Sequence, residues 1–245
     1  MPGSSQTCSP PPLRRYFAER PRLGKLTAMG TRGVVAVLLI VGVLAGCGSD
    51  RNSGVDIARI AEVKASFGPQ FSVTEVAPTG IDPKVLSGQK LPGGLTFQPP
   101  GCVQFASGQL VPAGTEGNMA ALSAEGEGNR FVVIAVQTNE AVPVVEPGSD
   151  CRKVAFRGGM VSGTVESVDV PTIDGTKTIG VHRVVQTVID GKPRTGEVYN
   201  YSAHFGDYQV IVSANPLVLP DKPVAPVDTQ RARDLLIAGV NAIRR

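Results

Sequence analysis

The chain has 245 residues, no tryptophan, 5% aromatic residues and a formal net charge of +3. Six basic residues and one acidic residue precede Cys47, so the 199 residues from Cys47 onward carry 18 Lys/Arg against 20 Asp/Glu, a net charge of −2. That balance leaves no excess of cations to follow a phosphate backbone, which excludes nucleic acid as an expected partner. The length suits one domain with a core, and the abundance of Val, Gly and Thr favours strands and turns.

An apolar run from Val34 to Ala45 follows Arg32 and ends at Gly46. This is the layout of a secretory signal: a basic residue, a short apolar stretch and a small-residue cleavage site. A membrane-spanning helix needs about 20 apolar residues, so the run is too short to be one. A short uncleaved anchor or a buried helix is the alternative. We expect residues 29–46 to be a signal peptide and residues 1–28 to be a non-native extension before the true start.

The tetrad Leu44-Ala45-Gly46-Cys47 resembles the lipobox of bacterial lipoproteins. The resemblance implies that Cys47 receives a diacylglycerol thioether and becomes the first mature residue. Two or more acyl chains hold a protein firmly to a bilayer, at about 0.8 kcal/mol per buried CH₂. Residues 47–56 begin with small polar side chains that suit a tether. The expected location is the outer face of the cell membrane, with the membrane contacted through Cys47.

The remaining cysteines indicate one disulfide. Cys8 lies before the signal and Cys47 is assigned to the lipid, which leaves Cys102 and Cys151 as an even pair in an oxidising compartment. A metal-binding pair or a catalytic thiol is the alternative, but neither cysteine has His or Cys neighbours at ligand spacing.

The elements expected up to residue 175 are mostly short. Spacing and turn residues predict a helix over 55–67, a strand over 71–76 and a covering loop over 78–100 with at most one helical turn at Lys84–Leu86. They then predict a helix from Thr115 that ends at Gly126 and Gly128, and a strand over 131–137 that is buried on both faces. A strand over 160–170 and a turn at Asp174-Gly175 complete this part of the chain.

Three alternating strands follow. Their apolar faces run over Val181–Ile189, Tyr199–Phe205 and Tyr208–Ala214. Gly206-Asp207 predicts a two-residue hairpin loop that places Phe205 opposite Tyr208. A loop of three or five residues is expected around Asp190-Gly191-Lys192, because a two-residue loop would put the two apolar sets on opposite faces.

Asp228 is expected to cap a final amphipathic helix that extends to about Ile243. Its apolar stripe suits packing on the sheet, where Arg244 and Arg245 would lie at the negative end of the helix dipole. The summed pattern predicts an α+β fold, an antiparallel meander of about five strands with N- and C-terminal helices packed on one face. We expect residues 57–245 to form this single domain outside the cytoplasm.

The lipobox, the Pro99-Pro100-Gly101-Cys102 step, Cys151, the strand run and the closing helix together resemble a group of actinobacterial, mainly mycobacterial, lipoproteins of unknown function. The pattern is similar, more distantly, to the extracellular sensor domain of certain mycobacterial membrane serine/threonine kinases. The resemblance covers roughly Ile57 to Arg245. It implies an α+β module with disulfides and a cleft, although this chain has one cysteine pair rather than two and no kinase domain.

Residues that carry chemistry are few. There is no Gly-x-Ser-x-Gly motif, and two histidines alone cannot complete a zinc site. His182 and His204 both fall in expected strands, opposite the apolar sets, either as solvated residues or as parts of a shared polar pocket. Tyr199 and Tyr201 either join them in a cleft or pack in the core. No cofactor, metal or catalytic residue is expected.

These observations predict a non-enzymatic, membrane-anchored envelope module that binds a small molecule, a lipid or an envelope protein through a cleft. The alternative is a carrier of lipids or glycolipids, which requires a large apolar cavity. A hydrolase that uses an unrecognised Ser or Asp with His182 or His204 is the least favoured function.

Overall fold

The chain divides into two units, Met1–Ser49 and Asp50–Arg245, and the fold described here is that of the second. This computed structural model describes residues 54–82, 91–108, 110–220 and 222–245. The signal segment, Cys47 and the helical turn expected at Lys84–Leu86 lie outside the described residues.

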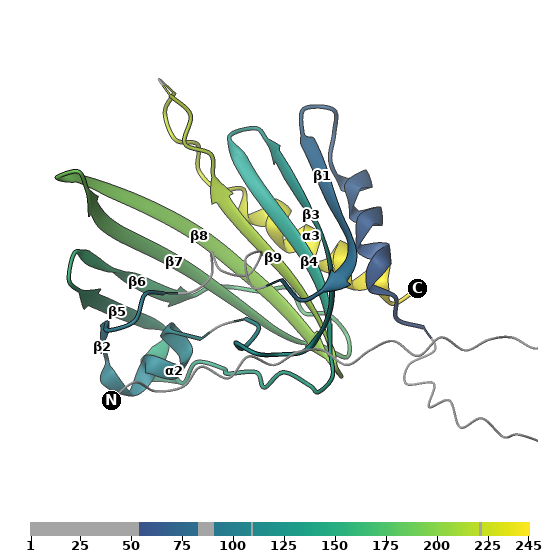
Figure 1. Ribbon diagram of the computed structural model, residues 1–245, viewed down its shortest axis with the longest axis horizontal. Helices are drawn as coiled ribbons and strands as arrows, with labels where there is room; N and C mark the ends of the chain where they lie inside the picture. The colour runs from purple at the N-terminus through teal and green to yellow at the C-terminus, as the bar shows by residue number, and fades with distance from the viewer. Residues whose placement is uncertain (1–53, 83–90, 109, 221) are drawn as a thin grey trace, which may run out of the picture. The chain divides into compact units, whose positions relative to one another are not determined.

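The described residues form one antiparallel sheet of nine strands, in the order β1-β3-β4-β9-β8-β7-β6-β5-β2 (Figure 1). The strands are β1 (Ser72–Gly80), β2 (Thr96–Gln98), β3 (Gly117–Gly126), β4 (Asn129–Thr138), β5 (Lys153–Gly158), β6 (Val161–Ser167), β7 (Lys177–Ile189), β8 (Lys192–Phe205) and β9 (Tyr208–Pro216). The helices are η1 (Ile57–Ser66), η3 (Pro100–Cys102), α2 (Val103–Ala106), η4 (Ser149–Cys151) and α3 (Thr229–Ile243). The α+β character agrees with the sequence prediction, but the expected number of about five strands is wrong.

One face of the sheet, here called the helix-side face, carries η1 and α3 over β1, β3, β4, β9 and β8. Its core contains the fully buried Phe131, Tyr201 and Leu236. Gly239 of α3 allows the closest approach, since a Cβ there would lie 2.9 Å from Cγ1 of Val210 and 3.1 Å from Cδ1 of Ile60. The helices at the two ends of the domain therefore cover one face together, as expected.

Both ends of α3 are held by side chains. The Asp228 carboxylate accepts a hydrogen bond from the backbone N–H of Arg231 at 2.9 Å, which confirms the predicted cap. At the other end, the Arg244 guanidinium donates to the carbonyls of Asp174 and Gly175 at 2.7 and 3.1 Å and lies 4.1 Å from the ring centroid of Phe205. These contacts join the helix to the 174–175 turn and to the β8–β9 hairpin.

The opposite face, here called the disulfide-side face, is also covered. Two apolar clusters lie there, one around Phe105, Val154 and Phe156 and another around Met119 and Ile134. The Cys102–Cys151 disulfide, with a Cα–Cα distance of 5.4 Å, joins the segment after β2 to the segment before β5. The predicted pairing is therefore present, and it holds two segments that are 49 residues apart.

The loop between β7 and β8 differs from the prediction. Ile189 pairs with Lys192, so the loop has two residues, Asp190 and Gly191, both with positive φ (52° and 72°). That backbone is the two-residue turn which an Asp-Gly pair favours. The register places the apolar residues of β7 on the disulfide-side face and those of β8 on the helix-side face. The prediction was wrong because it assumed that both strands bury the same face, whereas β8 packs its apolar residues under the helices and β7 packs Val181 and Val185 on the opposite face.

The predicted helix from Thr115 is also wrong, because those residues enter β3. β3 pairs with β4 along ten residue pairs, and Glu127 and Gly128 turn the chain between them with positive φ. Central strands are buried on both faces and lack alternation, so Met119, Ala120 and Leu122 gave a pattern that also fits a helix. The neighbouring prediction, a doubly buried strand over 131–137, is confirmed by β4.

Candidate functional site

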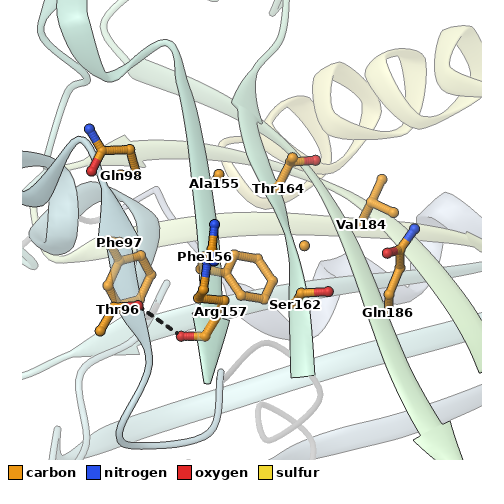
Figure 2. Close-up of a pocket in the computed structure, with 11 residues that line it drawn as sticks. Thr96, Phe97, Gln98, Ala155, Phe156, Arg157, Ser162, Thr164, Val184 and Gln186 are labelled. Atoms are coloured by element: carbon orange, nitrogen blue, oxygen red, sulfur yellow. Dashed lines mark hydrogen bonds between the residues drawn. The ribbon is translucent and has the colours of Figure 1, made fainter. Parts of the chain in front are cut away.

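The helix-side face continues beyond β8 as an open groove of about 910 Å³ over β2, β5, β6 and β7 (Figure 2). The groove is lined by Thr96, Phe97, Gln98, Ala155, Phe156, Arg157, Ser162, Gly163, Thr164, Val184 and Gln186. Because side chains alternate along a strand, Val184 and Gln186 lie on the same face as His182 and its cross-strand partner Tyr199. We call this part of the face, from β2 to β7, the open half.

Strand register arranges the groove side chains in two rows across the sheet. The tip row runs over the directly paired Thr96, Arg157, Ser162 and Gln186. The middle row runs over Gln98, Ala155, Thr164 and Val184. Figure 2 shows both rows, each with one side chain per strand. Regular pairing therefore brings together residues up to 90 positions apart, from Thr96 to Gln186.

Beneath the groove, on the disulfide-side face, Gly163 of β6 allows close packing against β5 and β7. A Cβ at Gly163 would lie 2.0 Å from the Val184 carbonyl oxygen and 2.5 Å from Cζ of Phe156. The Phe156 ring therefore occupies the space that a side chain at Gly163 would need. At the edge, the Thr96 hydroxyl donates to the Arg157 carbonyl at 3.1 Å, and the disulfide follows a few residues after β2. These contacts fix β2 against β5.

A third row, the histidine row, borders the middle row and runs over Lys153, Glu166, His182 and Tyr199. The His182 ring stacks on Tyr199 with centroids 4.0 Å apart, and its Nε2 lies 3.1 Å from a carboxylate oxygen of Glu197. Burial, with the nearby Glu197 and Glu166 carboxylates, raises the pKa of Tyr199. The phenol therefore keeps its proton and remains a hydrogen-bond donor beside the groove.

The two remaining candidates lie elsewhere. Tyr201 is completely buried under the helices in the helix-side core, where burial raises its pKa. His204 lies on the disulfide-side face, because it pairs with Lys177 and Gln209 across the sheet. His182 and His204 therefore face opposite sides of the sheet, and they do not share a pocket.

His204 lines a small pocket of about 70 Å³ between β7, β8, the α2 segment and residues 143–145. Its Nε2 lies 3.0 Å from the Ser202 hydroxyl and 3.3 Å from the Gln209 amide nitrogen. Burial lowers the pKa of His204 to about 4, so the imidazole is neutral at pH 7. The Ser202–His204 distance suits proton transfer from a nucleophile, but Ser202 is completely buried, which keeps its hydroxyl away from a substrate.

The groove side chains carry hydroxyl, amide and guanidinium groups, which can form hydrogen bonds with a ligand. In the described part of the chain, no three His, Cys, Asp or Glu side chains come together to hold a metal ion. Sequence reasoning found His182 and Tyr199 but missed the two groove rows. The signal for the rows was the polar alternation Ser162, Thr164 and Glu166, whose partner strand β5 was not recognised.

Comparison with known proteins identifies similar proteins, but none of them has a described enzymatic activity that matches this chain. No curated protein matches the chain. The X-ray structure of an uncharacterized protein from Mycobacterium smegmatis, the Rv0999 ortholog, is 58% identical, with a TM-score of 0.74, over 79% of this chain and 99% of its own. The expected resemblance to mycobacterial proteins of unknown function is therefore confirmed.

The extracellular domain of PknH from Mycobacterium tuberculosis matches 74% of this chain and 91% of its own length at 15% identity and a TM-score of 0.36. This is the distant resemblance expected from the sequence, and such a low similarity gives no information about function.

Among the described residues, no helix is both long and apolar enough to cross a bilayer. A protein family described as "Domain of unknown function (DUF5642)" matches residues 56–244, and the chain belongs to this family.

Proposed function

We propose that the protein is a lipid-anchored module of the cell envelope that binds a ligand in the open groove and does not catalyse a reaction. The observation that carries the proposal is the groove itself, a hollow of about 910 Å³ on a rigid sheet with convergent polar side chains. Concave surfaces with a few oriented polar groups are the usual form of binding sites. The anchor is supported by the lipobox resemblance that ends at Cys47.

Two features support binding over the other candidate functions. The described core is tightly packed, with Phe131, Leu122 and Leu236 completely buried, and the groove is open and partly polar. A lipid carrier needs a large apolar cavity, so we do not propose that function. The Ser202–His204 pair, the nearest approach to a hydrolase, has its hydroxyl buried.

The anchor is tested by Cys47→Ala in the native host with an alkyne fatty acid as the metabolic label. We expect the wild-type protein to carry the label and to sediment with membranes, and the variant to lose both properties. A labelled or membrane-bound variant would contradict the anchor.

The groove is tested by native mass spectrometry of the protein purified from its own cells. Thr164→Trp places a large side chain in the middle row, and Thr74→Trp makes the same change at an exposed position of β1. We expect a bound mass with the wild type and with Thr74→Trp, and its loss with Thr164→Trp. Equal occupancy in both variants, or no bound species in any of them, would contradict binding in the groove.

A further inference from the structure

The side chains of the groove narrow the class of ligand that it fits. Of the residues that line it, Arg157 is the only charged one. The other polar side chains are the hydroxyls and amides of Thr96, Gln98, Ser162, Thr164 and Gln186. Each of these groups both donates and accepts hydrogen bonds. A complementary ligand therefore carries many hydroxyl or amide groups and few charges.

The spacing of these groups suits a linear ligand that crosses the strands. Neighbouring strands lie about 4.8 Å apart, and the tip row offers one polar side chain on each of β2, β5, β6 and β7. Sugar rings in an extended oligosaccharide repeat at a similar interval, with hydroxyl groups at their edges. A chain of about four rings would therefore meet one strand per ring.

The groove also has apolar side chains in positions to contact the CH faces of such rings. In the middle row, the apolar Ala155 and Val184 alternate with the polar Gln98 and Thr164. On one side of the rows is the stacked pair of His182 and Tyr199, and on the other is Val188 of the same face, 42% exposed. Alternating polar and apolar contacts of this kind complement the edges and faces of a sugar ring.

Arg157 adds a preference for one negative group. Nearby Lys153 forms an ion pair with Glu166 at 2.5 Å. Arg157 forms no ion pair with any other described residue. A guanidinium binds a carboxylate through two parallel hydrogen bonds, which orients the ligand as well as attracting it. One carboxylate at this point of the tip row would therefore be matched.

An extended peptide fits the same place less well. A peptide gains most by adding a strand to a sheet edge. The edge here is β2, which has only three residues and is followed by Pro99 and Pro100. Proline has no backbone N–H to donate, so the edge offers too short a ladder.

We propose that the groove binds an acidic oligosaccharide, which lies across β2, β5, β6 and β7 with its carboxylate on Arg157. This inference rests on the proposed function, because it names the ligand class of the same groove.

The test is an NMR titration of the purified, ¹⁵N-labelled protein with three probes. Unsulfated chondroitin tetrasaccharide supplies hydroxyls, N-acetyl groups and carboxylates. Tetra-N-acetylchitotetraose, here called chitotetraose, supplies the same groups without carboxylates. An acidic Gly/Ser/Glu heptapeptide supplies the carboxylates on a peptide backbone. We expect chondroitin to shift the amide signals of both rows, chitotetraose to shift the same signals more weakly, and the peptide to leave them unchanged.

Arg157→Gln should weaken chondroitin binding about tenfold and leave chitotetraose binding within about twofold. Arg194→Gln, an exposed cation of β8 on the opposite face, is the matched control and should change neither. The inference is overturned if neither sugar shifts the rows, or if Arg194→Gln weakens chondroitin binding as much as Arg157→Gln does. If only the peptide shifts the rows, groove binding stands and the oligosaccharide assignment falls. The native mass spectrometry experiment judges groove binding independently.

Discussion

Under α3, the helix-side face presents Tyr201, Val210 and Val212, all completely buried. Beyond β8, the same face of the same sheet presents Ser162, Thr164 and Gln186 to an open groove. The backbone lattice is antiparallel and continuous in both halves. The difference therefore comes from the side chains alone. One half binds the chain's own helices through apolar contacts, and the other half keeps a polar surface that is available to another molecule.

The largest effect that should separate the two halves comes from the disulfide. Replacing Cys102 and Cys151 together with serine removes a link across 49 residues, worth about 4 kcal/mol in the chain-entropy estimate. We expect urea denaturation to show a loss of that order. Hydrogen exchange should rise more in β2 and β5 than in β4 and β9, because the link holds the open half. An equal rise in all four strands would contradict this assignment.

The second comparison is a matched pair of truncations. Leu236→Ala leaves a cavity in the covered half and should lower the free energy of unfolding by about 3 kcal/mol. Val184→Ala, in the open half, removes a partly exposed side chain and should cost less than about 1 kcal/mol. Both values come from the same denaturation measurement. Similar losses of unfolding free energy in the two variants would mean that Val184 is buried by another part of the protein, which would contradict an open half.

The third prediction concerns His204, whose pKa is about 4 in the folded protein against 6.5 for an ordinary histidine. The unfolded chain therefore takes up the proton first, so stability is lost as the pH falls from 6.5 towards 4. Each unit of pKa difference corresponds to about 1.4 kcal/mol of unfolding free energy. Because water reaches part of the ring, we expect the free energy of unfolding to fall by about 2 kcal/mol over this range. His204→Gln should show a smaller decrease over that range in pH-dependent thermal or urea unfolding. An identical pH profile would refute the buried neutral imidazole.

The smallest effect concerns the start of α3. Asp228→Ala removes the acceptor for the Arg231 N–H and should cost about 1 kcal/mol. Asp234→Ala, an exposed position within the helix, is the control and should cost less than about 0.5 kcal/mol. Since α3 belongs to the covered half, neither change should alter ligand binding in the groove. A change in binding would show that the two halves are coupled.

Local chemistry predicted several elements well. The Gly206-Asp207 loop pairs Phe205 with Tyr208, α3 begins after Asp228, and Cys102 bonds to Cys151. Each depends on residues close in sequence or on a cysteine count. The β7–β8 loop could have been predicted too, because Asp190-Gly191 is a strong two-residue turn signal. The assumption that the sheet has one buried face overrode that signal.

The candidate site was less accessible to sequence reasoning. His182 and His204 were expected on one face, and the register separates them. The groove rows join residues from four strands, two of which lie in segments with weak strand patterns. Alternation along one strand says which residues share a face, but it does not say which strands are neighbours.

The sequence by itself determined the turns, the capped helix, the cysteine pairing and the balance of charge, because these depend on backbone preferences and residue counts. Only the tertiary structure decided that nine strands join in one sheet, that β8 and β7 bury their apolar residues on opposite faces, and that the helices stop short of β7. Those outcomes depend on which segments, far apart in the sequence, pack together and exclude water between them. The groove exists for that reason, as the part of the helix-side face over which the chain has no helix among its described residues.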